Sequence, residues 1–69
     1  MINKRADDKA VLVKVGSVWA IDDCQLVITD ITTQGGVDYA HYRYLDDDDC
    51  AYREASEFRW LFEYVRGEL

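Results

Sequence analysis

The stretch that decides the fold is residues 24–45, which read CQLVITDITTQGGVDYAHYRYL. Its centre, Gln34-Gly35-Gly36, is the strongest turn signal in the chain, because paired glycines tolerate the positive φ angles of a tight hairpin. The residues on both sides are β-branched, aromatic or alternating, which is the pattern of extended strands. We therefore predict that residues 24–32 and 37–45 pair as an antiparallel hairpin.

The alternation of side chains predicts how each of these strands is oriented. In the first strand Cys24, Leu26 and Ile28 share a face, but the next strong apolar residue is Ile31, one position out of step. This slip predicts a β-bulge near Thr29-Asp30. In the second strand one face carries Val37, Tyr39, His41, Arg43 and Leu45, and the other carries Asp38, Ala40, Tyr42 and Tyr44.

Shorter extended segments flank the hairpin. Residues 11–15 form a β-branched run that ends at Gly16-Ser17, and residues 18–21 resume the extended pattern until Asp22-Asp23 closes it. Residues 50–53 read as a strand that returns after an aspartate turn. Residues 1–9 are a polar leader that we expect to be flexible, so a single small domain should occupy residues 10–69.

Helical periodicity is confined to the end of the chain. Ser56 suits an N-cap and Glu57 a first turn. Apolar residues then recur with the spacing of an amphipathic helix, at Phe58, Leu61, Phe62 and Val65. Arg66 would lie in the last turn, and Gly67 suits the position just after it. We predict one C-terminal helix.

These elements predict a mainly β (α+β) domain. A chain of 69 residues supplies one core at most, and 49% hydrophobic residues are enough to build it. We expect a small SH3-like barrel or a curled antiparallel meander of about five strands, closed by the helix. A three- or four-stranded sheet with the helix across one face is the alternative. The large side chains expected to bury most area are Trp19, Trp60, Phe58, Phe62 and the tyrosines.

Charge and composition limit the partners. Fourteen acidic residues against eight basic ones give a net charge of −6, which disfavours direct binding to nucleic acid. No apolar run is long enough for a membrane span or a secretory signal, so we expect a cytoplasmic chain without membrane contact. Cys24 and Cys50 form no C-x-x-C pair and are expected to be half-buried free thiols.

A resemblance spans about residues 15 to 62. The succession Gly16-Ser17-Val18-Trp19, Val27-Ile28-Thr29-Asp30-Ile31, Val37-Asp38-Tyr39, Ser56-Glu57-Phe58 and Phe62 resembles small bacterial and bacteriophage domains of unknown function. Those domains have a β-barrel-like plan with a Phe-rich closing segment. The resemblance implies a mobile-element or accessory protein and no catalytic residue, and the shared pattern does not demand the aspartate run.

Catalysis and metal binding are not expected. His41 is the only histidine, and Cys24 and Cys50 are the only plausible nucleophiles, but no base, orienting group and oxyanion donor can be assembled around them. Asp46 to Asp49 lack the spacing and the glycine of a calcium loop, so we read them as a solvated hairpin tip. No enzyme activity, cofactor or metal is predicted.

Two interaction surfaces are candidates for function. The first is aromatic and consists of Tyr39, Tyr42, Tyr44 and Tyr52; the second is acidic and consists of Asp46, Asp47, Asp48 and Asp49. Together they predict a non-catalytic protein-interaction domain whose partner is a protein or peptide of basic character, or a second copy of the chain. The alternative is an acidic inhibitor that mimics nucleic-acid charge in a basic channel of another protein.

Overall fold

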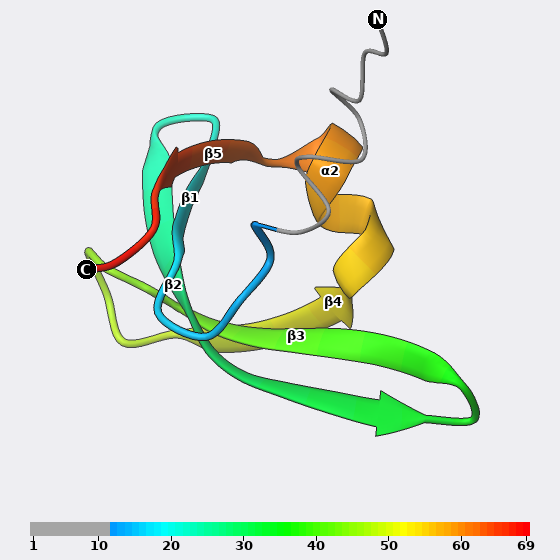
Figure 1. The fold of residues 1–69 in the computed structure, drawn as a ribbon. Coiled ribbons are helices and arrows are strands. Elements are labelled where there is room, and N and C mark those ends of the chain that lie inside the picture. The colour runs from blue at the N-terminus through cyan, green and yellow to red at the C-terminus, as the bar shows by residue number, and fades with distance from the viewer. Residues whose placement is uncertain (1–11) are drawn as a thin grey trace, which may run out of the picture.

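The strands form one antiparallel sheet with the order β4-β3-β2-β1-β5 in the computed structural model, which describes residues 12–69 (Figure 1). The strands are β1 (Val18–Ile21), β2 (Cys24–Gln34), β3 (Val37–Tyr44), β4 (Cys50–Glu54) and β5 (Glu63–Arg66). A 3-10 helix, η1 (Ala55–Glu57), and a helical turn, α2 (Phe58–Leu61), connect β4 to β5. The predicted mainly β domain is confirmed. Of the two predicted arrangements the structure has the curled meander, because β4 and β5 remain edges and the sheet does not close into a barrel.

The central hairpin is built as predicted. Gln34 pairs with Val37 across a two-residue turn, in which Gly35 and Gly36 have φ angles of 60° and 81°. Positive φ at both central positions is the type I′ geometry, whose twist matches that of the flanking strands. The turn therefore sets the register of β2 against β3.

The predicted β-bulge is also confirmed. The register of β2 against β3 shifts between Ile28, opposite Tyr42, and Asp30, opposite His41. The shift returns Ile31 to the inner side of the sheet, where it packs against the core. Ahead of the bulge β2 pairs with β1 as well, so this one strand joins the two halves of the curled sheet.

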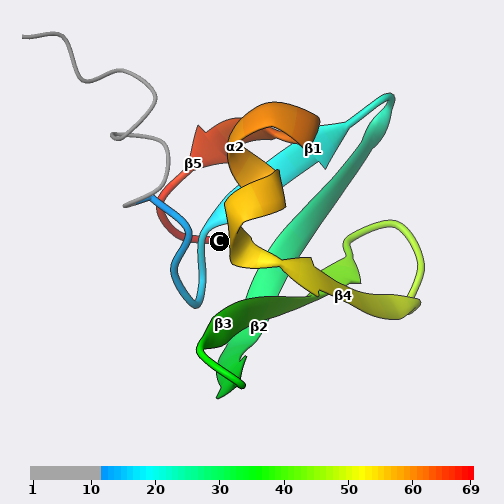
Figure 2. The same ribbon diagram turned by 90° about the vertical axis from the view of Figure 1, so that its right-hand side faces the viewer.

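The core lies between the curled sheet and the helical segment. Figure 2 shows η1 and α2 crossing in front of β1 and β2, and the ring of Phe58 lies 5.3 Å from that of Trp19. Trp19 and Phe58 are completely buried. The whole buried cluster is Trp19, Leu26, Ile28, Ala40, Tyr42, Phe58 and Phe62. Trp60 does not belong to it, contrary to expectation, because its side chain is 71% exposed.

The C-terminal helix is much shorter than predicted. Helical structure ends at Leu61, Phe62 adopts extended dihedral angles, and residues 63–66 form β5 against β1. Ser56 lies within η1 and does not cap a helix, and Arg66 ends a strand. The reason is competition: a helix of about ten residues is marginal, whereas aromatic and β-branched residues suit a strand that completes the sheet beside β1.

The strand predicted over residues 11–15 is absent from the part of the chain that the structure describes. Residues 12–17 form turns and irregular backbone instead, and Leu12 and Val13 pack half-buried against the core. Gly16, with a φ of 96°, donates its N–H to the carbonyl of Ile28. The leader predicted over residues 1–9, and the start of the domain at residue 10, lie outside the described residues.

Candidate functional site

Three aromatic side chains gather on the side of β3 and β4 that faces away from the core. We call Tyr39, His41 and Tyr52 the aromatic face. The ring of Tyr52 lies nearly parallel to that of His41, at 5.4 Å and 24°, and edge-on to that of Tyr39, at 6.0 Å and 74°. Tyr52 is 64% exposed, whereas Tyr39 and His41 are half-buried. The cluster therefore holds large side chains in fixed positions at the surface.

The sheet register assembles the aromatic face. Tyr39 and His41 are two residues apart on β3 and share one side of the sheet. Tyr52 of β4 lies directly opposite His41 and diagonally from Tyr39. Such cross-strand neighbours are close enough for rings to touch.

A hollow of about 250 Å³ lies beside the aromatic face, lined by Thr32, Gln34, Tyr39, His41 and Tyr52. The Thr32 hydroxyl is 2.8 Å from His41 Nε2, which fixes the orientation of the imidazole. The lining offers two phenol rings together with an imidazole, an amide and a hydroxyl, so it combines apolar area with hydrogen-bonding groups. This composition suits a side chain or short segment from a partner protein.

The four predicted surface tyrosines do not share one surface. Tyr42 is buried, with its ring 5.7 Å from the rings of Phe58 and Phe62, so it cannot form a contact surface. Tyr44 is half-buried beside it, with the rings 5.6 Å apart. Burial raises the pKa of the Tyr44 phenol, and the neighbouring Tyr42 hydroxyl adds to the rise. Because alternation sends even-numbered β3 residues to the core, only Tyr39 and Tyr52 remain as predicted surface residues.

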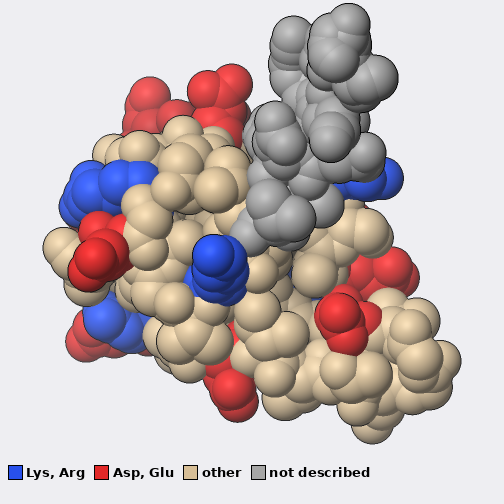
Figure 3. Space-filling model, in the orientation of Figure 1, with Lys and Arg blue, Asp and Glu red and all other residues tan. Residues whose placement is uncertain are grey.

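The acidic run forms the exposed connection between β3 and β4. Asp46, Asp47, Asp48 and Asp49 are all exposed, and the loop is anchored where the Tyr44 N–H donates to the Asp49 carbonyl at 3.0 Å. On the side of the molecule seen in Figure 3, acidic groups lie at the top, left, bottom and right of the surface, and Lys and Arg lie among those at the left. The charge on that side is thus spread over the surface and does not form a single acidic patch.

Replacing Asp47 and Asp48 together by Asn is expected to leave the fold intact. Both side chains are exposed, and the change relieves repulsion between adjacent carboxylates, so the free energy of unfolding should stay within about 0.5 kcal/mol of its original value or rise. Urea denaturation checks this. A loss of cooperative unfolding would instead identify the loop as a structural site, for example for a cation.

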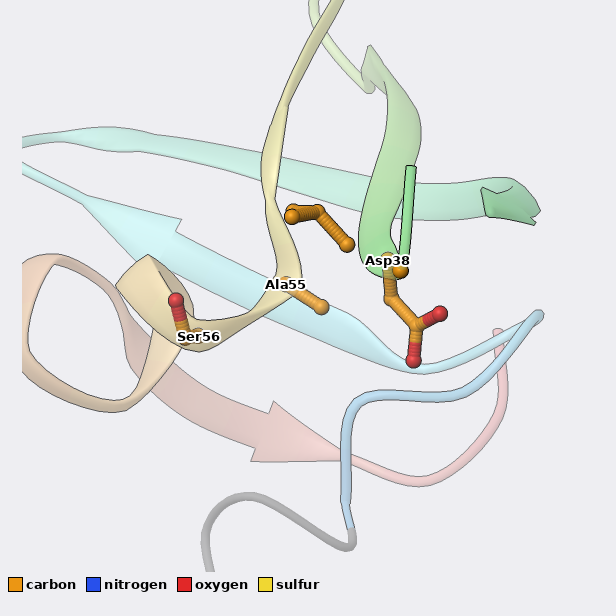
Figure 4. Close-up of a pocket in the computed structure, with 5 residues that line it drawn as sticks. Asp38, Ala55 and Ser56 are labelled. Atoms are coloured by element: carbon orange, nitrogen blue, oxygen red, sulfur yellow. The ribbon is translucent and has the colours of Figure 1, made fainter. Parts of the chain in front are cut away.

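A second hollow, of about 280 Å³, lies between the start of β3 and η1 (Figure 4). It is lined by Gly36, Val37, Asp38, Ala55 and Ser56. The Asp38 carboxylate accepts a hydrogen bond from the Thr33 hydroxyl at 2.7 Å, and in Figure 4 it points away from Ser56. The hollow therefore brings no nucleophile and base together.

Reactive residue types are scattered in the described chain. Cys24 and Cys50 are free, as predicted, but are exposed rather than half-buried, because they lie at strand starts beside turns. Across residues 12–69 no three His, Cys, Asp or Glu side chains converge as metal ligands. Within the same residues no helix has the length and apolar character needed to cross a membrane.

Comparisons with protein-family models, with curated proteins and with solved structures found no match to this chain. The site therefore has to be interpreted from its own geometry.

Three lining residues of the site were missed from the sequence. From the sequence alone, His41 has no role in a contact surface, Thr32 lies at the end of a predicted strand and Gln34 lies in the predicted turn. The signal was available for His41, because alternation already placed it beside Tyr39. Thr32 and Gln34 lie on the same side of the sheet as Tyr39 only because the β-bulge shifts the alternation of β2 by one residue. Their position therefore depends on the register after the bulge.

Proposed function

We propose that this chain is a small, non-catalytic protein-interaction domain that binds a protein or peptide partner through the aromatic face. The observation that carries the proposal is the exposed Tyr52 ring, held against His41 and Tyr39 at the rim of a hollow. Following the resemblance, we assign the domain to an accessory or mobile-element protein that acts in the cytoplasm.

The energetics of exposed aromatic side chains support this function. A domain with so few residues gains stability from every large ring that it buries, yet Tyr52 is left 64% exposed. Tyrosine gives a large contact area at a low cost in conformational entropy, and its hydroxyl finds partners at wet interfaces. Neighbouring rings already hold Tyr52 in place, so little further order is lost on binding.

The alternative function, an acidic mimic of nucleic acid, requires carboxylates gathered on one surface at spacings like those of phosphates. Four aspartates do gather in one loop, but on the side seen in Figure 3 the acidic groups are spread over the surface and do not form one patch. This distribution favours an interaction domain whose acidic residues assist the aromatic contact.

The test compares affinity captures from a lysate of the source cell with the wild-type chain and the Tyr39→Ala/Tyr52→Ala variant. We expect a partner that the wild type retains and the variant loses by at least about tenfold at the same salt concentration. Trp60→Ala is the matched control, because it removes an exposed aromatic side chain from another element. Loss of the partner in the Trp60 variant alone would place the contact elsewhere. A partner that both variants retain at low salt, and that the wild type and both variants all lose at high salt, would favour the acidic mimic.

A further inference from the structure

The outer edge of β4 lies at one end of the described sheet. Among the described strands β4 has β3 as its only hydrogen-bonded neighbour. The Tyr44 N–H donates to the Asp49 carbonyl at 3.0 Å, and antiparallel ladders alternate bonded and non-bonded pairs. Ala51 and Arg53 therefore face β3 with their backbone groups. The N–H and C=O groups of Cys50, Tyr52 and Glu54 point outward.

We propose that β4 accepts an extended, positively charged peptide segment of the partner protein as an added strand. The outward backbone groups of Tyr52 and its neighbours supply the hydrogen bonds of this addition. The segment's side chain opposite Tyr52 packs beside the aromatic face, since directly opposed residues of paired strands share a side of the sheet. The inference rests on the proposed function and names the class of its partner.

The charge around β4 selects a basic segment. Asp46, Asp47, Asp48 and Asp49 precede the strand, and Glu54 ends it. Arg53 does not offset them, because its guanidinium lies 3.2 Å from the Glu57 carboxylate in an ion pair. A strand laid along β4 thus passes carboxylates at both ends, and lysine or arginine side chains complement them.

The same charges disfavour a second copy of the chain as the added strand. Antiparallel pairing of two β4 edges about Tyr52 would set Cys50 opposite Glu54, which brings Asp49 of each copy next to Glu54 of the other. Carboxylates would then lie beside carboxylates.

A substitution at Glu54 can block the outer edge of β4 without breaking the sheet. Its φ angle is −58°, which proline adopts without strain, and its N–H points outward, so no hydrogen bond of the sheet is lost. Glu54→Pro therefore blocks an added strand while keeping β4. Glu54→Ala is the matched control, since it removes the same carboxylate and keeps the N–H.

The probe is a fluorescein-labelled octapeptide, KTKVKVKT, and the readout is fluorescence polarisation with the full chain. We expect saturable binding that weakens by about tenfold or more with Glu54→Pro and by no more than about threefold with Glu54→Ala. A peptide N-methylated at its two central residues, which blocks both of its edges, should bind about tenfold more weakly at unchanged charge. The lysine-to-glutamate peptide should not bind. Thermal melts confirm that both protein variants are folded.

Two results would overturn the inference. One is the absence of saturable binding to KTKVKVKT; the other is binding that Glu54→Pro and N-methylation leave unchanged, which would indicate charge attraction alone. Neither result affects the proposed function, which fails if the Tyr39→Ala/Tyr52→Ala variant keeps its captured partner. If that variant keeps the partner while Glu54→Pro still weakens the peptide, edge addition stands without the aromatic contact.

Discussion

Replacing Phe62 by Ala is expected to lower the free energy of unfolding by about 3–5 kcal/mol, the usual cost of truncating a buried phenylalanine. Phe62 is 2% exposed, and its ring lies 4.4 Å from that of Phe58 and 5.7 Å from that of Tyr42. A core of this size supplies about 3–5 kcal/mol in total, so the variant should be largely unfolded at room temperature. Circular dichroism melts measure the loss.

Trp60→Ala is the control for this prediction, because Trp60 precedes Phe62 by two residues and is 71% exposed. Its removal should change the free energy of unfolding by less than about 0.5 kcal/mol. If the Trp60 variant were the less stable of the two, Trp60 and not Phe62 would be the side chain that packs in the core.

The centre of the sheet could be predicted from the sequence because its signals are local. Gly35-Gly36 permits only a few turn geometries, and that turn then sets the register on both sides. The bulge was visible as a single slip in the alternation of Leu26, Ile28 and Ile31. Each of these inferences needs only neighbouring residues.

The C-terminal segment could not be predicted in the same way, because its structure depends on a distant strand. Phe58, Leu61 and Phe62 fit a helix, yet the residues that follow pair with β1, and Tyr64 lies opposite Trp19. Spacing alone does not reveal that β1 has a free edge there.

The candidate site was predictable to the extent that alternation determines it. Tyr39 falls on the outer side of β3 and Tyr42 on the inner side, but the sequence does not show which side the core takes. That choice depends on where Phe58 and Phe62 pack. Tyr52 joins Tyr39 only through the register of β4 against β3, which the length of the acidic loop determines.

Ser17 was read only as part of a turn, yet it is 1% exposed and connects the turn to the core. Its hydroxyl donates to the Lys14 carbonyl at 2.6 Å and accepts the indole N–H of Trp19 at 2.9 Å. Ser17→Ala leaves that buried indole without its acceptor, which should lower the free energy of unfolding by about 1–3 kcal/mol. Urea denaturation measures the loss.

Two comparisons separate this effect from a general loss of a hydroxyl. Ser56→Ala, which removes an exposed hydroxyl whose contact with Glu54 is 3.4 Å long, should be nearly neutral. The Trp19→Phe variant has no indole N–H that could be left without an acceptor. Ser17→Ala should therefore lower the free energy of unfolding by less in that variant than in the wild type. Equal costs in both backgrounds would show that the bond to Trp19 contributes nothing and that Ser17 acts only through the Lys14 carbonyl. A reduced cost would show that the hydrogen bond from the Trp19 indole to Ser17 contributes to stability, by the difference between the two costs.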